Sequence, residues 1–379
     1  MTAPAGITRT PTLFLPVLAA AFVHISIGAL YLAPYHGDAS VMVCAPQVWL
    51  GQGPLEQVHK TIGTNGFDGT YYYVIAQNPL HPQEDFIDAP CYRRVRIFYP
   101  AAAWLLSGGG DAIRLLWVMP LLNLLATCGL AWLGARFALN HARSAWWGLL
   151  LPIAVNAIMP GLRNMTDPWS AMAVMGLLAA WILRWPVAVL AVWGIIAVLT
   201  REQNLAIVMV VSLGALLERD WKRFTATLLV AVAALSWIAV LWASYGHPPR
   251  AADTVDGPLA GMWYGWTHLG INGLGQPRNP LPHLVRMSLL TAQAICCLRI
   301  AICGPRFVGL VALAAVGLIT IAGAALFTDP SNYLRVLNWA PMAIWIWAVQ
   351  TGRRWPVVLL APALLWPLLE VRHVWLLVG

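Results

Sequence analysis

The sequence has few charged residues for its length. Asp, Glu, Lys and Arg together make up 10% of its 379 residues, whereas hydrophobic residues make up 60%. Soluble globular domains carry about 25% charged residues, so this composition argues against a surface covered by water alone. Apolar stretches of roughly 20 residues, the length that one helix needs to cross a bilayer, recur along the chain. The composition therefore predicts an integral membrane protein.

The sequence also lacks the short motifs of metal and nucleotide sites. It contains no HExxH or CxxC spacing, no P-loop, no GxSxG elbow and no Rossmann fingerprint. Its net charge of +8 forms no basic stripe with interleaved aromatic residues, because most basic residues lie in short connections between apolar runs. We therefore expect no bound metal or cofactor and no nucleic-acid partner.

Cysteine is scarce as well, with six residues in the chain. Those that fall in apolar runs are Cys128, Cys296, Cys297 and Cys303. A thiol in such surroundings behaves as a small apolar group and is expected to be inert. Cys44 and Cys91 both lie in a long loop, where an oxidising compartment would permit a bridge. We predict a disulfide between these two, with two free thiols as the alternative.

The apolar runs predict an all-α, polytopic transmembrane protein with about 11 spans in a single transmembrane domain. The runs cover approximately residues 12–34, 112–135, 145–160, 168–184, 187–200, 203–218, 224–245, 284–303, 307–327, 335–350 and 356–379. The first run is too long for the core of a signal peptide and has no clear small-residue cleavage site. We interpret it as a retained first span.

The basic residues are distributed asymmetrically among the connections. If the N-terminus is inside, ten of them fall in five inner connections, as the positive-inside rule requires. They are Arg136, Arg143, Arg184, Arg219, Lys222, Arg223, Arg299, Arg306, Arg353 and Arg354. Two long segments, 35–111 and 246–283, then lie outside. The apolar stretch 97–107 is short for a span, and a crossing there would invert every later connection. We expect it to form a juxtamembrane or re-entrant helix.

The first external segment carries prominent charged residues. Arg93, Arg94 and Arg96 run against the positive-inside trend. Either long loops translocate regardless of charge, or the three guanidinium groups capture an anion such as phosphate. Asp68 precedes three tyrosines in the stretch 67–79. It either caps a short surface helix or presents its carboxylate to a lipid-borne substrate, where it would accept a hydroxyl proton.

Ionisable residues also mark the outer ends of later spans. They are Asp167, Arg201, Glu202, Asp329 and Arg335, with Arg163 close by. Each alone is compatible with a solvated loop charge, but a charge at membrane depth is costly and usually faces a cavity or a partner. Because three separate connections on one face carry such residues, we expect them to line a common polar cavity. Arg163, Arg201 and Arg335 would give that cavity a positive potential.

Several of these stretches resemble a known group of membrane enzymes. A first span, a long external loop with an acidic residue, surface helices and further spans resemble the GT-C glycosyltransferases. FDGTYYYVIAQNP (67–79) and DAPCYRRVRIFYP (88–100) resemble bacterial cell-surface glycopolymer formation proteins, and TREQN (200–204) and SNYLRVLNWAP (331–341) fit the same group. The Asp-aromatic element is distantly similar to the Trp-Asp element of PIG-V type mannosyltransferases, with Phe67 in place of the tryptophan.

The resemblance implies transfer of a hexose or pentose from a polyprenyl-phosphate donor to a glycan, lipid or protein acceptor. It implies inversion at the sugar carbon, no obligatory metal, and a site on the periplasmic face of a bacterial inner membrane. It also implies Asp68 as the general base, with Asp38 second because of its place just after the first span. The residues expected to bind the donor phosphate are Arg93, Arg94, Arg96, Arg163, Arg201 and Arg335. Those expected to line the cavity are Tyr71, Tyr72, Asp88, Asp167, Glu202, Asp329 and Tyr333.

Two other functions compete with this interpretation. One is a transporter or flippase of a lipid-linked glycan, and the other is a non-catalytic subunit of a cell-envelope assembly with a partner protein. A transporter should show paired repeats and broken helices at the bilayer midplane. Here the polar groups gather at one rim, which favours chemistry at the membrane surface.

Overall fold

The computed structural model is built from helices. It describes residues 11–62, 66–250, 255–271, 279–328 and 335–378. Over these ranges the chain forms α-helices and short 3-10 helices and no strand; isolated bridges occur, such as the one between Val255 and Ala322. The predicted all-α class is confirmed for this part of the chain.

Five segments are long and apolar enough to cross a membrane. Four of them lie on the continuous helices α1 (Pro11–Leu32), α5 (Ala112–Asn140), α11 (Trp221–Tyr245) and α13 (Pro280–Cys303). The first of these spans, Leu13–Tyr35, also includes the 3-10 turn that follows α1. The fifth, Trp355–Leu376, runs through two 3-10 turns into α18 (Leu365–Val378). The four continuous helices have at least 22 residues each. At about 1.5 Å of rise per residue, this matches the roughly 30 Å of the hydrocarbon core.

Shorter apolar helices pack among the long ones. They are α8 (Asp167–Ile182), α9 (Val187–Thr200), α10 (Leu205–Leu217), α14 (Arg306–Ile321) and α17 (Trp339–Thr351). α8 packs on α9, α10 on α11 and α13 on α14, while α17 is buried, with Trp345 fully enclosed. With 13 to 16 residues, these helices are shorter than an upright span. The expected count of about 11 spans therefore stays a prediction.

The apolar run at 145–160 is not one continuous helix. α6 (Trp147–Ala154) ends before Asn156, whose φ of 52° lies in the left-handed region, and α7 (Ile158–Leu162) follows as a short helix. A residue in this conformation ends a helix, and asparagine tolerates it because its short polar side chain bonds locally. The expectation of a single span here was wrong, because hydropathy records burial and not backbone continuity.

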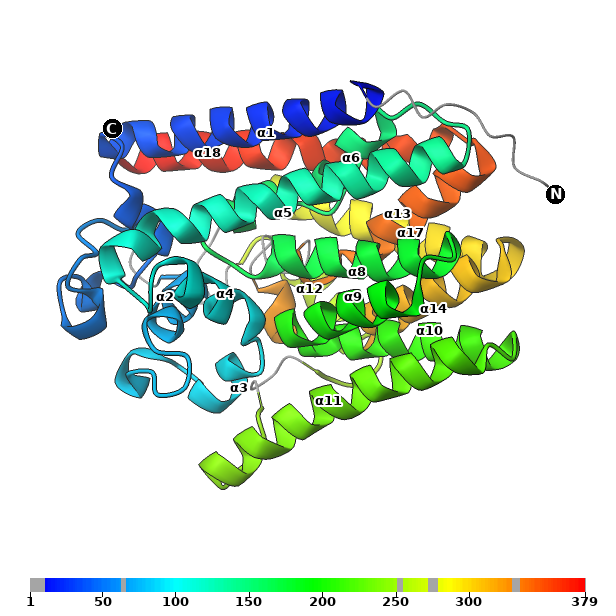
Figure 1. The fold of residues 1–379 in the computed structure, drawn as a ribbon. Coiled ribbons are helices and arrows are strands. Elements are labelled where there is room, and N and C mark those ends of the chain that lie inside the picture. The colour runs from blue at the N-terminus through cyan, green and yellow to red at the C-terminus, as the bar shows by residue number, and fades with distance from the viewer. Residues whose placement is uncertain (1–10, 63–65, 251–254, 272–278, 329–334, 379) are drawn as a thin grey trace.

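The segment predicted to be the first external one (35–111) forms a compact unit at one end of the helices, on the left in Figure 1. It contains α2 (Gly69–Gln77), α3 (Pro90–Arg94) and α4 (Phe98–Leu106), and Tyr73 is fully buried in a hydrophobic core of its own. α4 has nine residues, or about 13 Å of helix. Because this length cannot cross a bilayer, it agrees with the juxtamembrane helix expected at 97–107. The second external segment contains another short helix, α12 (Ala260–Thr267).

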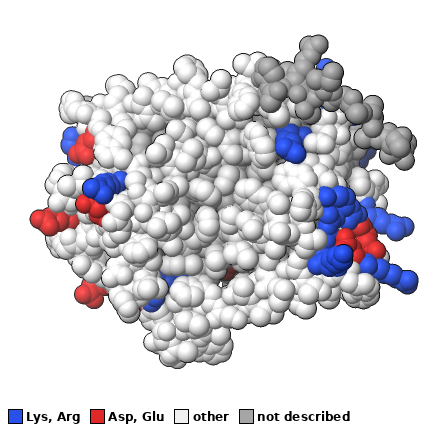
Figure 2. Space-filling view, in the orientation of Figure 1, with Lys and Arg blue, Asp and Glu red and all other residues white. Residues whose placement is uncertain are grey.

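Charged side chains gather at two opposite ends of the molecule. On the face that Figure 2 shows, a broad band with almost no charged side chain on its surface separates them, as a bilayer would require. Two contacts bring predicted inner connections together: Arg184 pairs with Glu218, and Arg143 Nε donates to the carbonyl of Val349. The connection between α10 and α11 lies at the end opposite to α2 and α4 (Figure 1).

Candidate functional site

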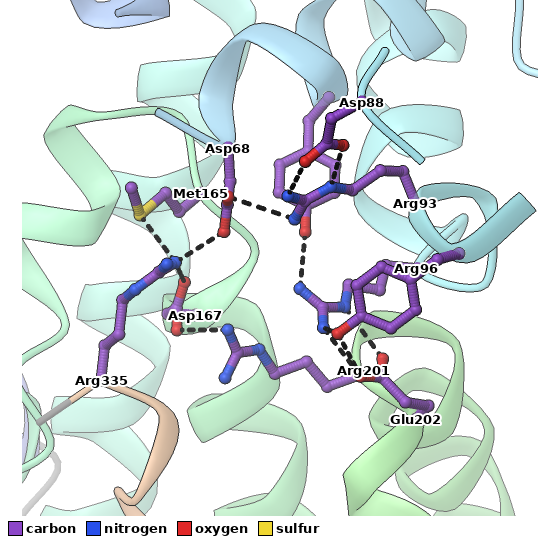
Figure 3. A network of polar contacts seen from close by, with 11 residues as sticks. Asp68, Asp88, Arg93, Arg96, Met165, Asp167, Arg201, Glu202 and Arg335 are labelled. Atoms are coloured by element: carbon purple, nitrogen blue, oxygen red, sulfur yellow. Dashed lines mark hydrogen bonds and ion pairs between the residues drawn. The ribbon is translucent and has the colours of Figure 1, made fainter. Parts of the chain in front are cut away.

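Asp68 lies directly before α2, with its carboxylate between two arginines. Its Oδ2 is 2.9 Å from Arg335 Nη1, and its Oδ1 is 3.1 Å from Arg93 Nη1 (Figure 3). The side chain makes no capping bond to α2. Asp68 has helical backbone angles (φ −52°, ψ −25°), whereas a capping residue is typically extended. Of the two interpretations offered by the sequence, the helix cap is therefore wrong, and the carboxylate points into a polar cluster.

Gly69 allows the backbone approach that places Asp68 in this cluster. A Cβ atom on Gly69 would lie 2.0 Å from the backbone oxygen of Arg163, far inside any real contact distance. The glycine lets the start of α2 rest on the connection between α7 and α8. The order Asp-Gly in the sequence thus has a steric reason, because only a residue without Cβ permits the approach that brings Asp68 to the cluster.

A second carboxylate, Asp167, extends the cluster towards α8 and α9. It is the first residue of α8, where the helix dipole favours negative charge, and it is buried. Its Oδ1 lies 3.1 Å from Arg201 Nη2, and its Oδ2 lies 3.5 Å from Arg335 Nη1. Arg335 therefore links Asp68 to Asp167, and Asp167 links Arg335 to Arg201 (Figure 3).

Two bidentate pairs complete the cluster on the side of the first external segment. Arg93 donates from Nε and Nη2 to the two oxygens of Asp88, both at 2.8 Å. Arg96 donates from Nε and Nη2 to the two oxygens of Glu202, at 2.9 and 2.7 Å. Paired contacts of this kind hold both planar groups in a fixed orientation.

Tyrosines support these arginines. The guanidinium of Arg93 lies 4.6 Å from the centre of the Tyr71 ring, a cation–π contact. Tyr72 Oη accepts from Arg96 Nη1 at 3.0 Å. Tyr92, which the sequence analysis missed, accepts from Arg96 and donates to Glu202 at 3.0 Å. Its spacing of four residues from Arg96, one helical turn, was the available signal.

The arginines set the protonation state of Asp68. Burial by itself raises the pKa of this carboxyl, but the positive charges of Arg335 and Arg93 outweigh burial and hold the pKa well below its usual range. Burial lowers the pKa of Arg93, but the charge of Asp68 and the bond to Asp88 raise it above the ordinary value. Asp68 is therefore an ionised carboxylate at neutral pH.

The cluster forms one end of a cavity of about 1090 Å³. Five arginines and three carboxylates line this cavity, which leaves an excess of positive charge at the polar end. The remaining lining is largely apolar and includes Ala206 of α10 and Ala314 and Leu318 of α14. The volume lies at the upper limit of small-molecule sites, which measure about 300–1,000 Å³. The cavity can therefore accept a large ligand with an anionic end and an apolar end.

Arg201 has hydrogen-bond donors without a partner at this cavity. The residue is 2% exposed, and its Nε and Nη1 have no hydrogen-bond partner among the described residues. A buried donor without a partner costs about 1–3 kcal/mol. These two N–H groups indicate a place for an oxyanion.

Several predicted residues do not line the cavity. Tyr71, Tyr72 and Asp167 contact its arginines without lining it, whereas Asp38 and Arg94 lie apart from the cluster. Asp38 caps the 3-10 helix Ala39–Val43, and its Oδ1 accepts from the backbone N–H of Ser40 at 2.9 Å. Arg94 donates from Nη1 to the hydroxyl of Tyr245 at 3.0 Å. Neither residue lines the cavity. The expected place of Arg94 in the phosphate-binding group is a misassignment, because its side chain leaves the short helix α3 on the face turned to α11.

Arg163 also lies outside this cavity. Its Nη2 is 2.8 Å from Glu370 of α18, and Arg286 of α13 approaches the same carboxylate at 3.6 Å. The sequence analysis missed both partners, although a charged residue inside an apolar run is itself a signal of function. The expected residues Asp329 and Tyr333 lie outside the described part of the chain.

The predicted disulfide is not formed. Cys44 and Cys91 are both free and buried. Cys44 Sγ lies 3.7 Å from Tyr31 Oη on α1, whereas Cys91 Sγ lies 3.7 Å from the carbonyl of His247 after α11. The two thiols belong to separate hydrophobic clusters. Cys44 packs with residues of α1 and Cys91 with residues of α11, so membership of one loop did not imply proximity.

Metal binding and known relatives give no further guide to the site. Among the described residues, no group of three or more His, Cys, Asp or Glu side chains is placed to hold a metal ion. No protein-family model, no curated protein and no solved structure matches the chain.

Proposed function

We propose that the chain is a membrane glycosyltransferase that moves a sugar from a polyprenyl-phosphate donor to a hydroxyl group of a glycan, lipid or protein acceptor. The observation that carries the proposal is the cavity of about 1090 Å³, which is cationic around Asp68 and apolar along α10 and α14. A polyprenyl phosphate has the same two parts, an anionic head and a long apolar chain. The prenyl chain occupies the apolar part, and the sugar and phosphate occupy the cationic end.

The phosphate is held by arginines at the polar end. Arg201 contributes the two unpartnered N–H groups, and Arg335 lies beside it across Asp167. Guanidinium groups match phosphate oxygens geometrically. During transfer the phosphate becomes the leaving group and gains negative charge. The N–H groups of the arginines are already in place, so they stabilise this transition state more strongly than they stabilise the bound sugar donor.

Asp68 acts as the general base. The acceptor oxygen attacks the anomeric carbon, and the bond from that carbon to the phosphate oxygen breaks. The electron pair of the broken bond stays on the phosphate, and the proton of the acceptor hydroxyl passes to Asp68. Attack on the face opposite to the phosphate inverts the configuration of the sugar carbon.

The low pKa of Asp68 fits this role once the donor is considered. While Arg335 and Arg93 both pair with it, Asp68 is a weak base. A bound phosphate shares the positive charge of these arginines, which raises the pKa of Asp68 because less opposite charge stabilises its ionised form. The carboxylate therefore becomes basic when the donor is present.

The direct test is an assay of the purified chain with a panel of radiolabelled polyprenyl-phosphate sugars and a cell-envelope extract as acceptor. Asp68→Asn should lower turnover by about 10²–10⁴-fold, the usual contribution of a positioned base. Asp85→Asn, an exposed acid of the same segment, is the matched control and should leave turnover unchanged. If Asp68→Asn keeps full turnover, Asp68 is not the base. If the wild type instead moves the intact donor across vesicles without sugar transfer, the protein is a flippase.

A second experiment tests the apolar part of the cavity. Ala314→Trp on α14 narrows it, whereas Leu313→Trp places the same bulk on the neighbouring residue, which is 54% exposed and does not line the cavity. We expect Ala314→Trp to raise the KM of a long-chain donor about tenfold, a loss of about 1.4 kcal/mol in binding, and to affect a short-chain donor less. An equal loss for both donors would contradict the placement of the chain.

A further inference from the structure

A second apolar opening lies between α1, α6 and α18, helices that do not line the large cavity. It is a crevice of about 260 Å³, lined mainly by apolar side chains such as Ile27 and Ile153. Phe22 and Leu368, which also line the crevice, are 72% and 54% exposed. In a helix bundle with apolar helices of spanning length, exposed apolar side chains of this kind face lipid chains. The crevice is therefore open to the bilayer.

The crevice leads inward to a polar cavity. Asn156, the residue at the break between α6 and α7, lines both the crevice and a small cavity of about 20 Å³. Arg163, Arg286 and Glu370 line this small cavity. Its volume admits roughly one water molecule, which needs about 10–15 Å³ measured this way. Arg335 lines both the small cavity and the large one, so the two spaces share a wall.

The small cavity has more positive charge than its own carboxylate balances. Arg163 and Arg286 are 6% and 7% exposed and share the single carboxylate of Glu370. The Nε atoms of both arginines and Nε1 of Trp366 are buried and have no hydrogen-bond partner among the described residues. Buried charge without full pairing is costly. Three unused donors around an excess of positive charge indicate an anionic ligand.

We infer that the crevice and the pair Arg163 and Arg286 form a second lipid site, which takes an acceptor lipid with a phosphate head group. This inference rests on the proposed transferase function. The acyl or prenyl chain lies in the crevice. The phosphate takes the place of the Glu370 carboxylate against the two guanidinium groups, because the small cavity admits only about one water molecule while Glu370 pairs with them. Arg335 lines both cavities and contacts Asp68 at 2.9 Å, so in this proposal the acceptor hydroxyl approaches the base from the side of Arg335.

The test uses photo-crosslinking of the full chain in detergent with a defined probe. The probe is hexadecyl phosphate with a diazirine at the chain end, and the matched neutral probe is the corresponding hexadecanol. We expect the phosphate probe to label peptides of α1 and α18 about tenfold more than the alcohol does, a preference of about 1.4 kcal/mol. Equal labelling of these helices by the two probes would overturn the inference.

Two variants separate a binding site from a structural ion pair. Glu370→Gln removes the competing negative charge and should increase labelling of α1 by the phosphate probe. If Glu370 only stabilises the fold, this variant leaves labelling unchanged or lowers it, and either result overturns the inference. Ile153→Trp fills the crevice and should abolish the labelling, whereas Val192→Trp on α9, a 54% exposed residue outside the crevice, should not.

The same experiment separates this inference from the proposed function. Labels on α10 and α14 report on the donor cavity, and labels on α1 and α18 report on the second site. Labels on α10 and α14 alone would overturn the second site and leave the donor site standing. A third outcome is that α1 and α18 are labelled, that both variants change the labelling as expected, and that the protein transfers no sugar. This outcome would support a phosphate-lipid site and overturn the proposed transfer.

Discussion

Individual side chains in the large cavity differ in how many partners they have. Asp68 and Asp167 each contact two arginines, whereas Arg201 contacts Asp167 through one nitrogen and has two further nitrogens without a partner. The carboxylates of Asp68 and Asp167 are thus already paired within the protein, whereas Arg201 has nitrogens left to bind a ligand. This difference makes Arg201 the most informative arginine to substitute.

Arg201→Lys should weaken donor binding while preserving the fold. Lysine keeps the charge opposite Asp167 but cannot supply the planar, two-pronged donor arrangement of a guanidinium. We expect the KM for the donor to rise about tenfold, equivalent to about 1.4 kcal/mol, with a small change in melting temperature. The measurement is steady-state kinetics at varied donor concentration. An unchanged KM would show that Nε and Nη1 of Arg201 do not meet the phosphate.

The ion pairs of Asp68 should also make stability depend on pH. The pKa of its carboxyl is lower in the folded chain than the value of about 3.9 expected unfolded. The unfolded chain therefore binds the proton first as pH falls, so the stabilisation is complete above about pH 5 and decreases progressively below it.

We expect the melting temperature of the wild type in detergent to fall more steeply than that of Asp68→Asn between about pH 5 and pH 3. Circular dichroism at 222 nm follows the unfolding. Asp85→Asn, at an exposed position, should follow the wild type. Parallel curves for wild type and Asp68→Asn would mean that the pKa of Asp68 does not change on folding.

The positions of the helices around the site depend on close backbone contacts as well as on ion pairs. α2 rests on the connection before α8 because Gly69 has no side chain, and this contact brings Asp68 towards Asp167 and Arg335. The break at Asn156 has a comparable role for the second site, because it ends α6 where the crevice meets the small polar cavity.

Gly69→Ala should therefore damage both stability and activity. The added Cβ would lie 2.0 Å from a backbone oxygen, so α2 has to shift. Overpacking of this kind costs about 1–3 kcal/mol, and we expect turnover to fall because Asp68 moves with α2. Gly270→Ala is the control, since nothing lies within 4 Å of a Cβ there. Equal melting temperatures and turnover for both variants would contradict the close approach.

At the scale of the whole molecule, the separation of charge into two ends predicts its orientation. Cys303 is the last residue of α13 and adjoins a predicted inner connection; its thiol is exposed and thus not enclosed as expected for an apolar run. Asp85 is exposed in the segment predicted to lie outside. In intact cells, a membrane-impermeant maleimide should label Asp85→Cys but not Cys303, and a permeant one should label both. Cys303→Ser gives the background. Labelling of Cys303 by the impermeant reagent would mean that the predicted inner and outer connections are exchanged.

The sequence by itself determined that the chain is helical, that it has helices long and apolar enough to cross a membrane, and which residues carry charge at the ends of the helices. These properties are local, since the length and hydropathy of a run determine whether a helix suits a bilayer. The expected juxtamembrane helix at 97–107 agrees with α4 for the same reason.

Only the tertiary structure decided which charged residues meet. Asp68 and Arg335 are 267 positions apart, and Arg163 and Glu370 are 207 apart. No local pattern distinguishes Arg93, which reaches Asp68, from its neighbour Arg94, which turns to Tyr245. The pairing of such side chains depends on how distant helices pack, because packing determines which buried charges have a partner within reach.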